Sequence, residues 1–269
     1  MNRNLFLNEA RRNAFSLILW VIIITVLISV TMSVFRTFIE NQSKVMGMLS
    51  LVPKGALQFK GISNFSDLLS VLGFYAVNNV IYMMVLGSIF AIVLGSNILL
   101  KEEYNKTAEY LLTRPLTRSE IFFSKSALVF VNVLLLNLVT TLAGLASIVL
   151  VKTGPFSIRA FFILSLYTFL LNIMFGATGL FLSTIVKRSR PITTFCIGLV
   201  LIFYFIFTIS KITESIAKIG YLSPFKYVNL EVTSPAYKLD PVNLAYFLGV
   251  SLLLYGLSYR IYLRRDIYT

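Results

Sequence analysis

The chain has 269 residues, of which 57% are hydrophobic and 13% are charged, and its formal net charge is +13. Its mean hydropathy is +0.83. Soluble domains usually contain about 45–50% apolar and about 25% charged residues, so this composition excludes an ordinary water-soluble globular protein. We predict an integral membrane protein whose outer surface faces lipid.

Six stretches of the sequence contain no Asp, Glu, Lys or Arg. They cover residues 14–35, 68–100, 126–151, 160–186, 192–210 and 241–259. Each has roughly the length that a bilayer-crossing helix needs, which is about 20 apolar residues. The strands of a membrane β-barrel would be about 10 residues long and would alternate in polarity, unlike these unbroken runs. We therefore predict an all-α integral membrane protein, with residues 1–269 forming one transmembrane domain of six spans.

The distribution of Lys and Arg between the loops predicts the orientation of the spans. With six spans, both termini lie on one side, together with residues 101–125 and 187–191. These segments hold 14 of the 24 Lys and Arg residues in fewer positions than the opposite segments, which hold the rest. Cytoplasmic loops are richer in Lys and Arg. We therefore expect a multi-pass protein of the cell membrane with its N- and C-termini in the cytoplasm.

The positive charges lie next to the apolar runs, as anchors to lipid headgroups do. We therefore expect membrane lipid, and no nucleic acid, as a partner. Near the N-terminus, Arg3, Arg11 and Arg12 are interspersed with apolar residues such as Leu5. This stretch forms either a weakly amphipathic helix in the inner headgroup layer or a charged anchor that fixes the topology.

Residues 101–125, between the second and third runs, read KEEYNKTAEYLLTRPLTRSEIFFSK. Thr107 can cap a short helix that runs to Leu112, and Pro115 ends it, because proline cannot continue a helix. The Thr-Arg-Ser-Glu sequence that follows has the spacing of a capping box, with Thr117 as the cap. The pattern predicts a long helix, a short cytoplasmic helix, a proline turn and a second long helix.

This segment resembles the cytoplasmic segment between the second and third spans in membrane permeases of type-2 class ABC exporters. In that family the segment typically runs from a glutamate pair through Gly-Thr, Leu-Leu, Pro and Arg to Lys. The matching residues here are Glu102, Glu103, Thr107, Leu111, Leu112, Pro115, Arg118 and Lys125. Lys106 stands where glycine is usual. Leu-Ser-Pro-Phe at residues 222–225 and Arg-Arg-Asp-Ile at residues 264–267 add to the likeness.

The resemblance implies the transmembrane subunit of an ATP-driven exporter. Two permeases, identical or related, would form the translocation path, with a short coupling helix between spans two and three of each. A separate ABC ATPase would bind ATP and Mg²⁺, and this chain would hold no cofactor or metal. The residues that the resemblance assigns to ATPase coupling are Glu102, Glu103, Thr107, Leu111, Leu112, Pro115 and Arg118.

The residues themselves point away from catalysis in this chain. The sequence has no histidine and one cysteine, Cys196, and no carboxylate lies inside an apolar run, so we find no metal cluster or activated nucleophile. The sequence also lacks G-x-x-x-x-G-K-[ST], the phosphate-binding loop of many ATPases. We expect a permease subunit rather than an enzyme. The alternatives are a membrane-embedded lipid-modifying enzyme and a non-transporting integral scaffold.

Small and neutral polar residues occur within the apolar runs. Six asparagines could line a neutral path or bond between helices, and we expect hydrogen bonding between helices for most of them. They are Asn78, Asn79, Asn97, Asn132, Asn137 and Asn172. Gly176 and Gly179 are expected to allow close helix packing.

Overall fold

The computed structural model describes residues 3–50, 68–104, 117–151, 154–186, 190–212, 214–232, 234 and 237–264. Six of its helices are long and apolar enough to cross a membrane, which confirms the predicted all-α membrane fold. They are α1 (Arg3–Glu40), α5 (Val71–Tyr104), α7 (Arg118–Val151), α8 (Ile158–Ile185), α9 (Arg190–Ile209) and α10 (Pro241–Arg264). Shorter helices are α2 (Gln42–Ser50), η1 (Glu214–Leu222) and η2 (Pro224–Tyr227).

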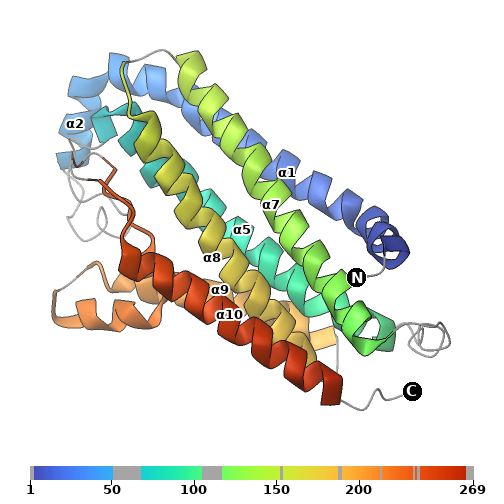
Figure 1. The fold of residues 1–269 in the computed structure, drawn as a ribbon. Coiled ribbons are helices and arrows are strands. Elements are labelled where there is room, and N and C mark those ends of the chain that lie inside the picture. Colours follow the sequence, from blue (N-terminus) through green and yellow to red (C-terminus); the bar gives the residue numbers. More distant parts are fainter. Residues whose placement is uncertain are drawn as a thin grey trace.

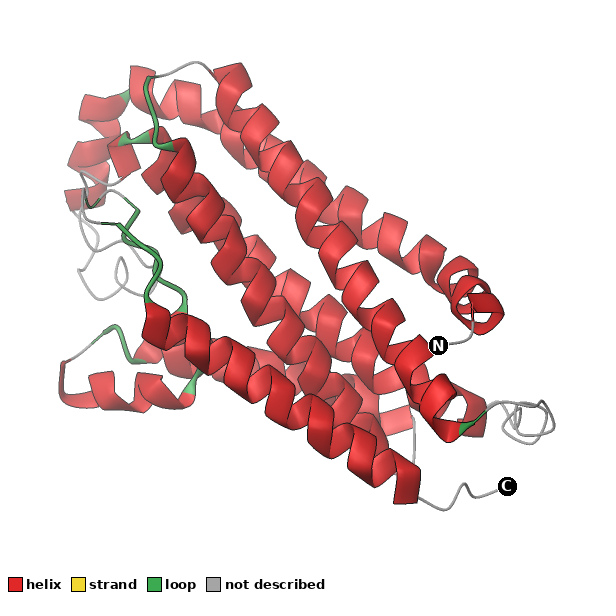
Figure 2. Cartoon of the chain, viewed as in Figure 1, coloured by secondary structure: helices red, strands yellow, loops and turns green. Residues whose placement is uncertain are grey.

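The six long helices form one bundle with two distinct ends (Figures 1 and 2). The start of α1, the end of α5, the start of α7 and the end of α10 lie at one end, which we call the terminal end. The helices α2 and η1 lie toward the opposite end, which we call the far end. This arrangement is the one expected of an even number of spans.

The helices extend beyond the uncharged runs of the sequence. In particular, α1 begins at Arg3, so the N-terminal stretch forms its first turns. Leu5, Phe6 and Ala10 pack against the core, while Arg11 and Arg12 are exposed. The stretch is therefore an amphipathic helix whose apolar face contacts the bundle.

The helices α5 and α8 form the centre of the bundle. Within the most apolar stretch of each helix, 72% of residues in α5 and 67% in α8 are buried, against 17% in both α1 and α10. The apolar faces that remain exposed on the surrounding helices match a lipid solvent, since lipid gives no drive to bury them. The bundle is thus built around one central helix pair.

Glycines allow α5 and α8 to approach backbone to backbone. A methyl group at Gly179 would meet the carbonyl oxygen of Ile92, and one at Gly95 would meet the carbonyl oxygen of Gly176. A methyl group at Gly176 would lie 3.3 Å from a methyl carbon of Val129. Small residues at such contacts permit the close packing that holds membrane helices together. The prediction that Gly176 and Gly179 serve close packing is confirmed.

Asparagine side chains join helices inside the bundle. Asn172 donates to the amide oxygen of Asn137 at 3.2 Å and accepts from the Ser88 hydroxyl at 3.2 Å, which links α8, α7 and α5. Asn97 donates to the Thr193 hydroxyl at 3.2 Å, which links α5 and α9. Two further asparagines donate to carbonyl oxygens of their own helices, namely Asn78 and Asn132. The predicted interhelical role is confirmed for Asn97, Asn137 and Asn172.

Aromatic packing attaches the far-end helix η2 to the bundle. Ser223 caps η2 by accepting from the amide of Phe225 at 3.3 Å, and its hydroxyl donates to the carbonyl of Phe203 at 2.7 Å. Phe225 is fully buried against the rings of Phe175 and Tyr204, at centroid distances of 5.5 and 5.7 Å. The segment after α9 therefore folds back onto the bundle.

The burial of Lys211, just beyond α9, predicts that the stability of the fold depends on pH. Its ammonium lies 4.3 Å from the ring centre of Phe207, and burial lowers its pKa from 10.5 to about 8, although Glu231 opposes the shift. Between about pH 8 and pH 10.5 the unfolded chain holds this proton and the folded chain does not, so this residue stabilises the fold increasingly as pH rises. We expect the thermal unfolding midpoint of wild type, relative to Lys211→Met, to rise between pH 7.5 and 9.5.

The control for this measurement is Lys218→Met, because Lys218 is exposed on η1. That variant should keep the wild-type pH dependence. An identical pH dependence in wild type and Lys211→Met would contradict the lowered pKa of Lys211.

Candidate functional site

The candidate site is the terminal end of α5 and α7, because the predicted coupling segment connects these two helices. Glu102 and Glu103 lie in the last turn of α5, and Arg118 is the first residue of α7. The other predicted coupling residues, and with them the predicted short helix, lie outside the described residues: Thr107, Leu111, Leu112 and Pro115. The structure thus shows where the predicted segment is attached at both ends.

The start of α7 has the capping box that the sequence predicts. The backbone N–H of Thr117 donates to the Glu120 carboxylate at 3.0 Å, and the backbone N–H of Glu120 donates to the Thr117 hydroxyl at 3.2 Å. The Thr117 hydroxyl also donates to the same carboxylate, at 3.1 Å. These bonds satisfy backbone donors that a helix start otherwise leaves unpaired. They fix the point at which the predicted coupling segment becomes helix.

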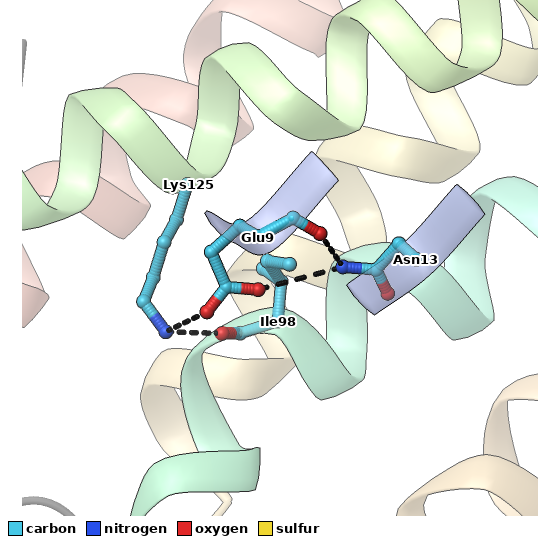
Figure 3. Close-up of polar contacts among 4 residues, drawn as sticks. All are labelled: Glu9, Asn13, Ile98 and Lys125. Carbon is cyan, nitrogen blue, oxygen red and sulfur yellow. Dashed lines mark hydrogen bonds and ion pairs between the residues drawn. The ribbon is translucent and has the colours of Figure 1, made fainter. Parts of the chain in front are cut away.

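A buried lysine joins α7 to α5 and α1 at this end (Figure 3). The Lys125 ammonium donates to the carbonyl oxygen of Ile98 at 2.7 Å and lies 3.9 Å from the Glu9 carboxylate. Both charged side chains are almost completely buried, with 0% exposure for Lys125 and 4% for Glu9. Asn13 orients Glu9 by donating to its backbone carbonyl at 2.8 Å and to its carboxylate at 3.4 Å.

The sequence did not reveal this ion pair. Glu9 and Lys125 both lie outside the uncharged runs, with Lys125 immediately before the third run. Because the helices continue past those runs, charges at their edges become buried between helices. The likeness to ABC exporters marked Lys125 as a motif residue, and the structure shows what its side chain contacts.

On its other side, the start of α7 is attached to α10. The Arg118 guanidinium donates to the carbonyl of Leu263 at 3.3 Å. The ring of Phe122 is fully buried among three tyrosine rings of α10, with centroid distances of 5.4 to 5.7 Å. These are Tyr255, Tyr259 and Tyr262. Arg118 therefore has a partner within this chain, in addition to any contact that it makes in an assembly.

An apolar groove of about 680 Å³ lies between α7, α8 and α10. Its walls include Phe130, Ile173 and Leu252, with Ser126 and Tyr255 among its few polar residues. The hydroxyls of Ser126 and Tyr255 lie 3.2 Å apart and bond to each other. A surface of this kind can hold an acyl chain or a helix, since neither requires hydrogen bonds from the wall.

A metal site would need several ligand side chains close together in the part of the chain that the structure describes. Within those ranges, no three or more Cys, Asp or Glu side chains are grouped so that they could hold a metal ion. The polar contacts described at the terminal end bind helices to each other.

Comparison with known proteins assigns the family of this six-helix chain. The sequence model of the ABC-2 family transporter proteins matches residues 3–267. The chain belongs to the ABC-2 transporter family. The match spans every described helix, so the ABC-2 resemblance inferred from residues 101–125 is confirmed for the chain as a whole. None of the curated proteins compared matches this ABC-2 permease.

In this ABC-2 permease, three features of the terminal end lie close together along α7. The capping box, the buried Lys125 and the aromatic contacts of Phe122 all lie in the first turns of α7. They surround the exit of the segment that carries the sequence resemblance. On that side of the segment, the start of α7 is therefore held in place by several contacts within the chain.

Proposed function

We propose that this permease is the transmembrane subunit of an ATP-driven exporter, assembled as two permeases with two copies of a separate ABC ATPase. The family match over residues 3–267 is the observation that carries the proposal. The chain lacks the usual phosphate-binding loop, so ATP and Mg²⁺ would be bound by the partner. The energy of ATP binding would reach this chain as a mechanical displacement.

Residues 101–125 are the proposed contact with the ATPase. Support comes from the way the flanking helices are held: α7 is bonded to α5 through Lys125 and to α10 through Arg118. A push on the connecting segment would therefore tilt α5 and α7 rather than unwind their ends. The path for cargo would open between the two permeases, where apolar helix faces such as those of α1 and α10 are available.

The ATPase partner can be tested by affinity purification from native membranes in mild detergent. We expect the permease to bring down a polypeptide containing a phosphate-binding loop, and the mixture to hydrolyse ATP. The permease purified alone in harsher detergent should hydrolyse none. Robust ATP turnover by the isolated chain would contradict this role, and a stable preparation without any ATPase would favour a scaffold or a lipid-modifying enzyme.

The proposed orientation places the terminal end in the cytoplasm. Ser43 in α2 and Arg264 at the end of α10 are both exposed and lie at opposite ends of the bundle. In intact cells, a cysteine at position 43 should react with a membrane-impermeant thiol reagent, and a cysteine at position 264 should react only after permeabilisation. Cys196 is buried and provides a low background. The reverse labelling pattern would contradict the orientation.

A further inference from the structure

Lys125 joins three helices through two contacts of different length, one to Ile98 and one to Glu9 (Figure 3). Lys125 on α7 is 2.7 Å from the Ile98 carbonyl on α5, which is a short charge-assisted hydrogen bond. Its distance to the Glu9 carboxylate on α1 is 3.9 Å, so that contact is an ion pair without a close hydrogen bond. The helices α5 and α7 are therefore bonded directly to each other, and the charge of Lys125 adds to the apolar packing of Leu5 and Phe6 that holds α1 to the bundle.

Burial makes this pair unlike an ordinary surface ion pair. Removing both charges from water costs free energy, and an apolar pair of similar volume would often give equal or greater stability. What an apolar pair does not give is an attraction that acts over several ångströms in a site shielded from water. A carboxylate 3.9 Å from an ammonium can follow it through a small displacement, whereas a packed methyl group loses its contact.

The location of the pair connects it to the coupling segment. Ile98 lies about one turn before Glu102 in α5, and Lys125 lies about two turns after Arg118 in α7, given 3.6 residues per turn. Any displacement of residues 101–125 must therefore pass through the two helix ends that Lys125 joins. On α1, the residues beside Glu9 that pack on the bundle are apolar, such as Leu5 and Phe6.

We infer that Glu9 is a positioning residue of the coupling apparatus, and that its pair with Lys125 transmits movement of residues 101–125 to the first turns of α1. This inference rests on the proposed function, because it needs an ATPase that moves the segment. If the inference holds, the first turns of α1 move together with residues 101–125. Asn13 supports Glu9 in this role by fixing its backbone and its carboxylate.

The test measures distances in the permease–ATPase complex in phospholipid nanodiscs, with and without ATP plus vanadate. One spin-label pair is placed at Arg12 in α1 and Ile185 in α8, which are both exposed. A second pair, at Phe123 in α7 and Ile185, reports whether α7 moves. In the wild-type complex, nucleotide should change both distances. With Glu9→Gln, the α7 distance should still change and the change at α1 should be lost.

A double variant separates coupling from stability. Glu9→Gln with Lys125→Met removes both charges of the buried pair together, so the complex should assemble even if the single variant does not. We expect its α1 distance to remain unresponsive to nucleotide. Glu40→Gln is the matched control, because it removes an exposed carboxylate of α1 that pairs with Arg36, and it should respond like wild type.

Three outcomes would overturn the inference. A normal α1 response in the double variant would mean that the pair only fills space. A wild-type complex in which α7 moves and α1 does not would remove Glu9 from coupling and leave the proposed function intact. A wild-type complex in which neither distance responds to nucleotide would overturn both proposals.

Discussion

Replacing Gly179 by leucine is expected to separate α5 from α8 and to cause a large loss of stability. The obstacle to a side chain at this position is the backbone carbonyl of Ile92, which cannot rotate away. Overpacking usually costs about 1–3 kcal/mol when side chains can adjust. Because backbone is the obstacle here, we expect the cost to exceed that range and the thermal unfolding midpoint in detergent to fall sharply.

The matched control is Gly249→Leu on α10. A side chain at Gly249 meets nothing within 4 Å and faces outward. Its unfolding midpoint should therefore stay close to that of wild type. Equal midpoints for the Gly179 and Gly249 variants would show that the close contact of α5 and α8 does not limit stability.

Replacing Lys125 alone by methionine is expected to destabilise the chain by about 3–5 kcal/mol, because it removes one member of a buried ion pair. The exposed pair of Arg36 and Glu40 gives the contrast. Its N–O distance of 3.2 Å is shorter than the 3.9 Å of the buried pair, but its side chains are 75% and 61% exposed. Removing one member of such an exposed pair should cost only about 0–1 kcal/mol.

Denaturant unfolding of Lys125→Met and Arg36→Gln in matched detergent measures this contrast. Burial, not distance, decides the expected order. If both variants lost the same small amount, water would have to reach Lys125 in the folded protein. Adding Glu9→Gln to Lys125→Met should recover much of the lost stability.

The sequence was sufficient to predict the features that depend on neighbouring residues. The six spans follow from runs of uncharged residues, because a bilayer requires that length whatever the helices pack against. The capping box of Thr117 and Glu120 follows from a spacing of three residues and needs no tertiary contact. The close packing at Gly179 was also predictable in kind, although the identity of the facing residue, Ile92, was not.

The features that depend on long-range packing could not be predicted. Glu9 and Lys125 lie far apart in sequence, and each is flanked by residues typical of a solvated helix end. Their burial follows from how α1, α5 and α7 meet, which no local pattern specifies. The uncharged runs also end before the helices do at this side of the bundle, so the runs alone do not show that the first turns of α1 and α7 pack between helices.

For the candidate site, the sequence predicted that Arg118 lies near a helix start, but not what its side chain contacts. The structure places Glu102, Glu103 and Arg118 at the two helix ends that flank the segment. It adds a contact within the chain for Arg118, through the carbonyl of Leu263. Contacts of the coupling residues with an ATPase remain predictions, as they depend on a second polypeptide.

The central claim is that an ATPase binds residues 101–125 and displaces them. Replacing Leu111 and Leu112 tests this claim most directly. Replacing both by aspartate removes apolar burial of about 1.5–3 kcal/mol per side chain at a protein contact and introduces charge there. The control replaces both by methionine, which conserves volume and apolarity. Cysteine labelling at position 43 confirms membrane insertion of each variant.

The measurement is co-purification of the ATPase with each variant, followed by ATP hydrolysis of the complex in phospholipid vesicles. We expect the methionine variant to retain both, and the aspartate variant to lose ATPase binding or the hydrolysis that depends on the permease. An aspartate variant with normal assembly and normal hydrolysis would contradict the claim that residues 101–125 couple this permease to ATP.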